Sequence, residues 1–319
     1  MSSSTPLDPT WERYTIEKIL METIKEQRRQ RRWRIFFRII YLLLLISVIF
    51  MLKPEHAMDY TKRNKTHSSL VSIEGPIMSD NHNNADDIME SLKAAFEDPK
   101  TKGVIIRLNS PGGSPVQADE IYGAIRALEK QHPKLPVIAV CSDICASAAY
   151  YIAAATQSIY ANPASIVGSI GVRMDSFGFV DTLQKLGITR RLVTAGTNKD
   201  FMDPFLPLNP SDVEHAHKML DTVHQQFIAA VEQGRGKRLK HSPELFSGLA
   251  WTGTDAKDNG LIDNFGNVNF VAKNVIKAED IVDYSSQSNL LTLLANNMGS
   301  QFAHTFLAAI RWQSPSSLT

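Results

Sequence analysis

Between residues 68 and 275 the chain switches repeatedly between two hydrophobic periodicities, and this alternation limits its fold more than any other feature. Residues 104–108 and 137–140 are short runs rich in β-branched side chains, which is typical of buried strands. Residues 118–128 repeat apolar side chains at helical spacing between these two runs. Strands that alternate with helices favour a parallel sheet with right-handed crossovers. The sequence therefore predicts an α/β fold.

The same patterns predict the remaining elements of this domain. A long helix is expected to begin at the capping-box sequence of residues 211–214, because Ser211 and Glu214 have the required spacing. Beyond residue 280 the pattern weakens to an expected pair of apolar helices at residues 290–295 and 302–310. Further strands are expected at residues 70–73, 158–161, 166–172 and 191–193, and a further helix over residues 88–96.

A basic cluster precedes an apolar run, residues 39–52, near the N-terminus. The run can be extended back to Ile35 if Arg38 snorkels towards the headgroups. As a helix, residues 35–52 would be about 27 Å long, close to the ~30 Å of a bilayer core. A cleaved signal peptide has a similar apolar length, but here the preceding segment is too long and no small-residue cleavage site follows before Pro54. We therefore expect an uncleaved anchor with the N-terminus in the cytoplasm. The basic residues are Lys25, Arg28, Arg29, Arg31, Arg32, Arg34 and Arg38.

These patterns divide the chain into five expected regions. A cytoplasmic basic segment, of which residues 11–34 suit a helix at the membrane surface, is followed by the anchor and a polar linker. The main α/β domain comes next, and a helical tail that would serve oligomerisation ends the chain. In order, the regions are residues 1–34, 35–53, 54–67, 68–279 and 280–319.

Composition excludes several classes of function. The formal net charge of +1 gives no reason to expect a nucleic-acid partner. Cys141 and Cys145 are the two cysteines of the chain, too few for a disulfide framework and without zinc-site spacing, so we expect two small buried thiols and no metal. A local bridge between them stays open if the domain faces an oxidising compartment. The sequence singles out none of the nine histidines as the base of a Ser-His-Asp arrangement, although it does not exclude one.

Three loops that follow strands carry residues that could take part in catalysis or ligand binding. Gly112 and Gly113 lie between a strand and a helix, where they suit either a tight turn or backbone N–H groups aimed at an oxygen. Ser147 begins an alanine-rich helix, and a serine there is most often a simple cap. Lys199 lies in a polar loop, where most lysines are merely solvated. Each signal is weak by itself.

Taken in order, these loops resemble the signal peptide peptidase A family, whose cores are related to Clp protease and crotonase. The resemblance covers residues 68 to about 275. One departure is Ala148-Ala149, where family members commonly have two glycines after the serine. Five matching motifs carry the resemblance, at residues 107–114, 146–152, 161–172, 199–205 and 251–263.

The resemblance implies a membrane-anchored serine endopeptidase with a Clp/crotonase-like core of repeated β-β-α units, residues 68–279 being the catalytic domain. Ser147 would be the nucleophile and Lys199 its general base, and an acyl-enzyme would form without any cofactor. Ser169 would orient the lysine amine. The backbone N–H groups of Gly113 and Ala148 would form the oxyanion hole.

The resemblance also implies an oligomeric state, a cellular location and partners. Family members of this half-length form assemble as rings, so a homo-oligomer, and specifically an octamer, is expected on the outer face of a bacterial inner membrane. The serine and lysine of one site can then come from neighbouring subunits. The expected partners are the lipid bilayer and apolar peptides, in particular the remnants of cleaved signal peptides. Two alternatives stay open, a crotonase-type acyl-CoA enzyme and a non-catalytic membrane scaffold that recruits other proteases.

Overall fold

The computed structural model describes residues 9–51, 63–240, 242 and 244–286, and it divides into two compact units, Met1–Tyr60 and Thr61–Thr319. The first unit contains α1 (Pro9–Met51), a single continuous helix. Within the described residues, no helix is both long and apolar enough to cross a bilayer. The end of the expected anchor, residues 48–53, lies outside the residues whose side chains are described.

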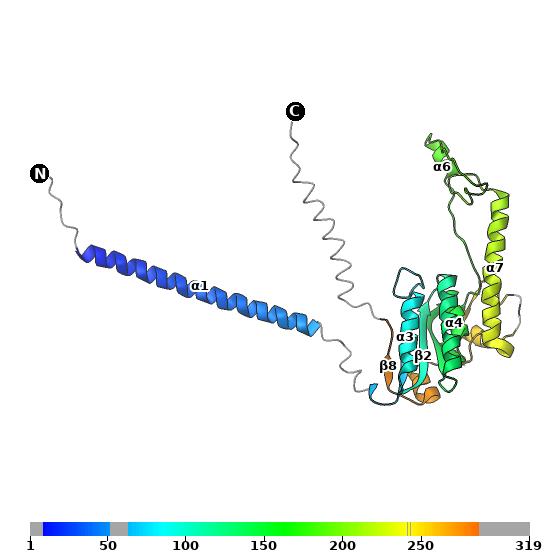
Figure 1. The fold of residues 1–319 in the computed structure, drawn as a ribbon, viewed down its shortest axis with the longest axis horizontal. Helices are drawn as coiled ribbons and strands as arrows, with labels where there is room; N and C mark the ends of the chain where they lie inside the picture. The colour runs from blue at the N-terminus through cyan, green and yellow to red at the C-terminus, as the bar shows by residue number, and fades with distance from the viewer. Residues whose placement is uncertain (1–8, 52–62, 241, 243, 287–319) are drawn as a thin grey trace. The chain divides into compact units, whose positions relative to one another are not determined.

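An eight-stranded sheet forms the centre of the second unit (Figure 1). Its main path runs β6-β5-β3-β2-β1-β8, with β4 beside β3 and β7 beside β4. Every pairing is parallel except that of β5 with β6. The predicted α/β fold with a parallel sheet is thus confirmed. The strands are β1 (His67–Glu74), β2 (Thr101–Ser110), β3 (Val137–Ala146), β4 (Ser158–Ala161), β5 (Ile166–Gly168), β6 (Ala250–Thr252), β7 (Asn264–Phe265) and β8 (Ile281–Asp283).

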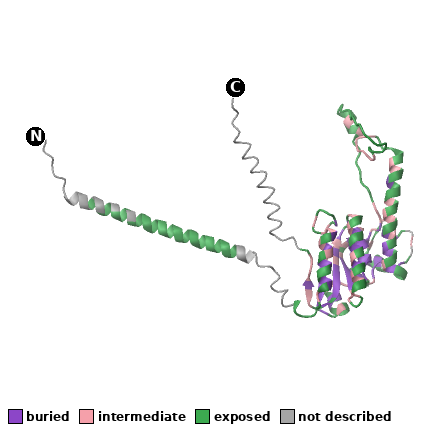
Figure 2. Ribbon diagram, in the orientation of Figure 1, coloured by how far each residue is buried: buried purple, intermediate pink, exposed green. Residues whose placement is uncertain are grey.

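Both faces of the sheet are covered, because successive side chains of a strand point to opposite sides. In β2, Ile106 and Leu108 enter the larger core with α3 (Ala85–Glu97), α4 (Pro115–Gln131) and α5 (Ala148–Ala154). Ile105 joins a smaller core with η3 (Val271–Ile276), which follows α9 (Val268–Phe270). Buried residues are accordingly concentrated in the strands and on the inner faces of these helices (Figure 2).

The segment between β5 and α7 (Pro210–Arg235) departs from the sequence prediction. The expected strand at residues 191–193 is wrong, since these residues are exposed and irregular. None of residues 171–209 is buried, and α6 (Val180–Lys185) is the one α-helix there. Without a neighbouring strand, a β-rich run has no hydrogen-bonding partner and stays irregular. We call residues 171–209 the arm.

Two predicted boundaries are also wrong. Helix α7 begins at Pro210 and not at Ser211, because the Asn209 side chain accepts a hydrogen bond from the Ser211 N–H and so acts as the cap. Strand β5 ends at Gly168 and not at residue 172, because Ser169 adopts a positive φ of 51°.

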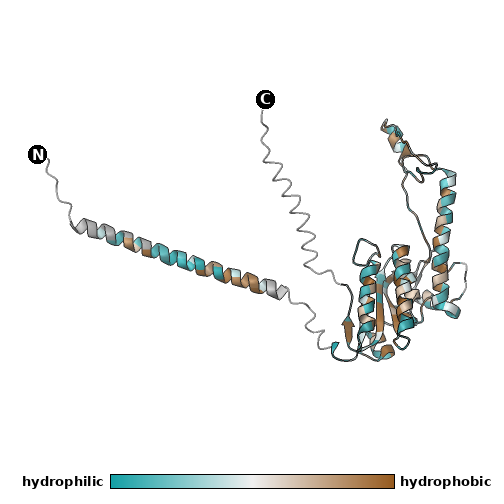
Figure 3. Cartoon of the chain, viewed as in Figure 1, coloured by the Kyte–Doolittle hydropathy of each residue, from teal (hydrophilic) through white to brown (hydrophobic). Residues whose placement is uncertain are grey.

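The first and the last described strands of the second unit are neighbours in the sheet. Strand β8 pairs with β1, so residues 281–283, expected in the tail, belong to the sheet. The expected tail helices at residues 290–295 and 302–310 lie outside the described residues, as do residues 54–62 of the expected linker. The hydropathy colouring shows β2 and β8 as apolar strands beside the mixed surface of α3 (Figure 3).

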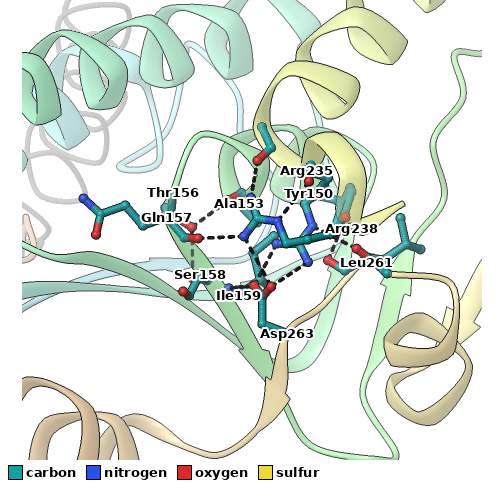
Figure 4. A network of polar contacts seen from close by, with 12 residues as sticks. Tyr150, Ala153, Thr156, Gln157, Ser158, Ile159, Arg235, Arg238, Leu261 and Asp263 are labelled. Carbon is teal, nitrogen blue, oxygen red and sulfur yellow. Dashed lines mark hydrogen bonds and ion pairs between the residues drawn. The ribbon is translucent and has the colours of Figure 1, made fainter. Parts of the chain in front are cut away.

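A buried ion pair ties the end of α7 to the sheet (Figure 4). The Arg235 side chain is fully buried and donates two hydrogen bonds to Asp263, at 2.7 and 3.0 Å. Its Nε also donates to the Gly260 carbonyl at 2.9 Å. Asp263 in turn accepts the Ile159 N–H of β4 at 2.8 Å, and Arg238 lies 3.3 Å from it. One carboxylate therefore joins a helix end to a strand.

The environment of Asp263 fixes how this ion pair responds to pH. Burial raises the pKa of the carboxyl, but the hydrogen bonds and charge of Arg235, followed by the Ile159 N–H and Arg238, outweigh that effect and lower the pKa below its ordinary value. A lowered pKa in the folded state contributes stability above the unfolded pKa, and that stability is lost as the pH falls through the folded pKa.

We predict that Asp263→Asn lowers the free energy of unfolding at neutral pH by about 2 to 3 kcal/mol, because Arg235 is left buried without its counter-charge. The difference from the parent should shrink once the pH drops below about 4. Urea unfolding followed by circular dichroism across pH measures both effects. Asp258→Asn, which changes an exposed carboxylate of α8 (Gly253–Asp258), is the matched control. Equal stability of the two variants at neutral pH would contradict the prediction.

Candidate active site

Ser147 occupies a strained turn between β3 and α5. Its φ of 54° is unusual for a residue with a side chain, and its N–H donates to the Gly168 carbonyl at 2.8 Å. Although Ser147 stands at the N-cap of α5, its side chain makes no capping hydrogen bond. The ordinary explanation for a serine at a helix start therefore fails here. Its Oγ lies at the carboxyl end of β3 and is available to react with a ligand.

The two glycines after β2 are required by close backbone approaches. Gly112 has a φ of 110°, and a Cβ there would lie 2.7 Å from the Ser147 Cβ and 3.1 Å from the Ala148 nitrogen. A Cβ on Gly113 would lie 2.0 Å from the Ile77 carbonyl oxygen. Gly113 also forms an isolated parallel bridge with Ile77. The absence of side chains lets this turn pack directly against the serine.

Ser169 forms the third turn of the site. Its positive φ is held by two contacts with the segment after α7, because its N–H donates to the Leu249 carbonyl at 2.9 Å and its Oγ donates to the Gly248 carbonyl at 3.2 Å. Gly171 lies so close that a Cβ on it would be 2.9 Å from the Gly248 Cα. Since the hydroxyl proton is already donated, Ser169 can offer only lone pairs to a further group.

These three turns surround a cavity of about 880 Å³. Of the five residues predicted from sequence, the cavity wall contains Gly113, Ser147, Ala148 and Ser169. Sequence reasoning missed the contribution of α7, although its helical apolar spacing was the available signal. Helix α7 supplies Val223, Gln226 and Phe227 to the wall, and the other lining residues include Met78, Val116, Asp119, Glu120, Tyr151, Val172, Arg173, Asp175 and Gly248.

Lys199 does not line this cavity and is exposed on the arm. Its loop is closed by a hydrogen bond from the Lys199 N–H to the Gly196 carbonyl at 3.3 Å. Nearby, Phe179 and Phe205 stack at 5.4 Å between ring centroids, and Arg190 forms an ion pair with Asp203. The arm is thus organised by its own contacts, and a single chain does not bring Lys199 to Ser147.

The two cysteines lie on β3, shortly before Ser147. Both Cys141 and Cys145 are free and buried, which confirms the expectation of two small buried thiols. Burial raises the pKa of the Cys145 thiol well above its ordinary value, and the neighbouring Cys141 raises it further. A thiol that resists ionisation is a poor nucleophile, so Cys145 does not compete with Ser147.

The domain that contains this cavity is similar to two known protein families. Residues 129–281 match the model of peptidase family S49, and residues 54–167 match that of Clp protease. These matches confirm the family resemblance predicted from the motifs. The two models together cover the three turns of the site.

Three similar proteins illustrate the range of the likeness. A Na(+)/H(+) antiporter NhaA of Brucella melitensis is 46% identical over 56% of this chain and 24% of its own length. A putative protease of Methanocaldococcus jannaschii is 32% identical over 60% of this chain and 63% of its own. A putative signal peptide peptidase SppA of Enterococcus faecium is 31% identical over 58% and 53% respectively. The chain thus matches less than two thirds of the length of each.

We predict that Gly112→Ala lowers the rate of Ser147 labelling by an organophosphonate about 100-fold, because the new Cβ displaces the serine. Mass spectrometry of the labelled chain measures the rate. Gly123→Ala is the control, since Gly123 lies in α4 with open space around its Cβ position and alanine favours a helix there. Parent-like labelling of Gly112→Ala would contradict the assigned packing.

Proposed function

We propose that the chain is a serine endopeptidase that cleaves peptides through an acyl-enzyme at Ser147, since residues 129–281 match the model of peptidase family S49. The observation that carries this proposal is the uncapped Ser147 hydroxyl, held on a strained turn in the wall of a large cavity. A strained strand-to-helix turn is a recurrent way to expose a nucleophilic serine. The adjacent Ala148 N–H lies at the start of α5, where backbone donors favour an oxyanion.

Each of the three turns has its own role in the proposed reaction. Ser147 Oγ attacks the peptide carbonyl while its proton passes to the neutral Nζ of Lys199, and the N–H groups of Gly113 and Ala148 stabilise the oxyanion. Collapse of the tetrahedral intermediate breaks the C–N bond, and the leaving amine takes the proton from Nζ. Water then hydrolyses the ester by the same route. Ser169, whose own proton goes to Gly248, would accept one N–H of the lysine and so aim its lone pair at Ser147.

Lys199 would reach Ser147 from a neighbouring copy of the chain, in a homo-oligomer that we propose to be an octamer. Two features of the arm support this arrangement: Lys199 is exposed away from the cavity, and the arm carries many exposed apolar side chains that a partner surface would cover. The exposed apolar residues are Met174, Phe177, Phe179, Leu186, Ile188, Leu192, Val193 and Leu208.

The proposed setting is the outer face of a bacterial inner membrane. Residues 35–53 would form the anchor, with the N-terminus in the cytoplasm, because a basic cluster at residues 25–34 precedes them. The proposed substrates are extended apolar peptides, including signal peptide remnants. The cavity wall includes residues 171–173, which lie outside any strand and are exposed or half-buried. Their backbone groups are therefore accessible to an extended peptide that binds by strand addition.

We predict that Ser147→Ala and Lys199→Ala each abolish cleavage of a quenched fluorescent apolar peptide, with a loss of at least about 1,000-fold. When the two inactive variants are unfolded together and reassembled, activity should return, because some sites then combine Ser147 of one subunit with Lys199 of another. Peptide fluorescence measures all three samples.

Lys185→Ala is the control for this experiment, since Lys185 is another exposed lysine of the arm, on α6. It should keep parent-like activity. If Lys199→Ala retains activity, the proposed base is wrong. If the reassembled mixture stays inactive while reassembled parent protein recovers, the dyad lies within one chain.

We predict that protease added to spheroplasts digests the catalytic domain and leaves an N-terminal epitope tag intact, because residues 35–53 would separate the two. Immunoblotting against both ends of the chain measures the outcome, and a cytoplasmic protein of the same cells is the control for leakage. Protection of the catalytic domain until the cells are lysed would overturn the proposed topology.

A further inference from the structure

The cavity around Ser147 is not uniformly apolar. Its wall carries three carboxylates, Asp119, Glu120 and Asp175, and a single cationic group, Arg173. Arg173 lies 3.5 Å from Asp175, so these two charges offset one another. Asp119 and Glu120 form no ion pair among the described residues. The cavity therefore has an excess of negative charge on the side formed by α4.

Asp119 is held in place by a buried tyrosine. The Tyr151 hydroxyl donates a hydrogen bond to Asp119 Oδ1 at 2.8 Å, while the Tyr151 ring stacks on Phe227 at 4.8 Å and meets Tyr122 edge-on at 5.4 Å. Tyr151 and Phe227 are almost fully buried and both line the cavity. A carboxylate fixed by packed aromatic rings is better pre-organised for a ligand than one on a free side chain.

The arrangement places an apolar surface and a negative charge in the same cavity as Ser147. Val116 and Val223 lie in the wall together with the aromatic pair, and they offer apolar contact for an aliphatic stem. Lysine and arginine have this composition, since a long apolar stem ends in a cation. A purely apolar substrate side chain would gain nothing from the negative charge of Asp119 and Glu120.

Resting on the proposed peptidase function, we propose that Asp119, oriented by Tyr151 and assisted by Glu120, makes the enzyme prefer peptides with a lysine or arginine next to their apolar residues. Asp119 is then a specificity-determining residue and takes no part in bond cleavage. The substrate class becomes cationic-apolar peptides, where the sequence alone indicated apolar ones.

A pair of peptides that differ only in lysine against norleucine tests this proposal with the full-length protein. Norleucine keeps the linear stem and lacks the ammonium group, so the ratio of their kcat/KM values isolates the charge. We expect the parent to favour lysine about five- to tenfold, as two exposed carboxylates allow. The ratio should fall when salt rises from about 0.05 to about 0.5 M.

The double variant Asp119→Asn, Glu120→Gln should bring the ratio to about one, and Glu90→Gln, at an exposed carboxylate of α3, should keep the parent ratio. The difference should lie in KM more than in kcat, because the interaction acts in binding. Equal cleavage of both peptides by the parent, or an unchanged ratio in the double variant, overturns the specificity proposal alone. Cleavage of neither peptide by the parent overturns the peptidase function and this proposal with it.

Discussion

The site depends on the close approach of three backbone turns at the carboxyl ends of β2, β3 and β5. The hydrogen bond from the Ser147 N–H to the Gly168 carbonyl joins the ends of β3 and β5, and Gly112 packs against the serine from the end of β2. Parallel strands place their carboxyl ends on the same edge, so turns distant in sequence converge there. The positive φ angles of Ser147 and Ser169 are strained, and the surrounding hydrogen bonds compensate for that strain.

The polarity of the hydrogen bonds limits what each hydroxyl can do. Ser169 gives its proton to Gly248, which leaves it an acceptor, whereas no capping bond occupies the hydroxyl of Ser147. A cavity with one uncommitted hydroxyl beside one acceptor suits a base that has both N–H groups and a lone pair. A lysine amine has both. The loop at residues 247–249 therefore matters to the proposed chemistry, because it accepts both hydrogen bonds that hold Ser169.

The sequence correctly predicted those elements that depend mainly on neighbouring residues. The apolar runs of β2 and β4 and the glycines at 112 and 113 are encoded by neighbouring residues, so their positions followed from sequence. The short strands β6 and β8 depend on pairing partners far away in the chain, and no hydrophobic periodicity in the sequence indicates them. The exposure of Lys199 agrees with its polar loop, but the motif gave no distance to Ser147, because a motif specifies residue type and order and not position in space.

The pairing of β1 with β8 has a consequence for biosynthesis. Ser68 of β1 lies opposite Ile281, and the fully buried Arg235 of α7 pairs with Asp263, so both elements need residues that are made late in translation. Closing so long a loop is slow and entropically costly. The ribosome must therefore have released most of the domain before its sheet is complete, and the nascent chain passes through a stage with an unfinished β1 edge exposed to chaperones and proteases.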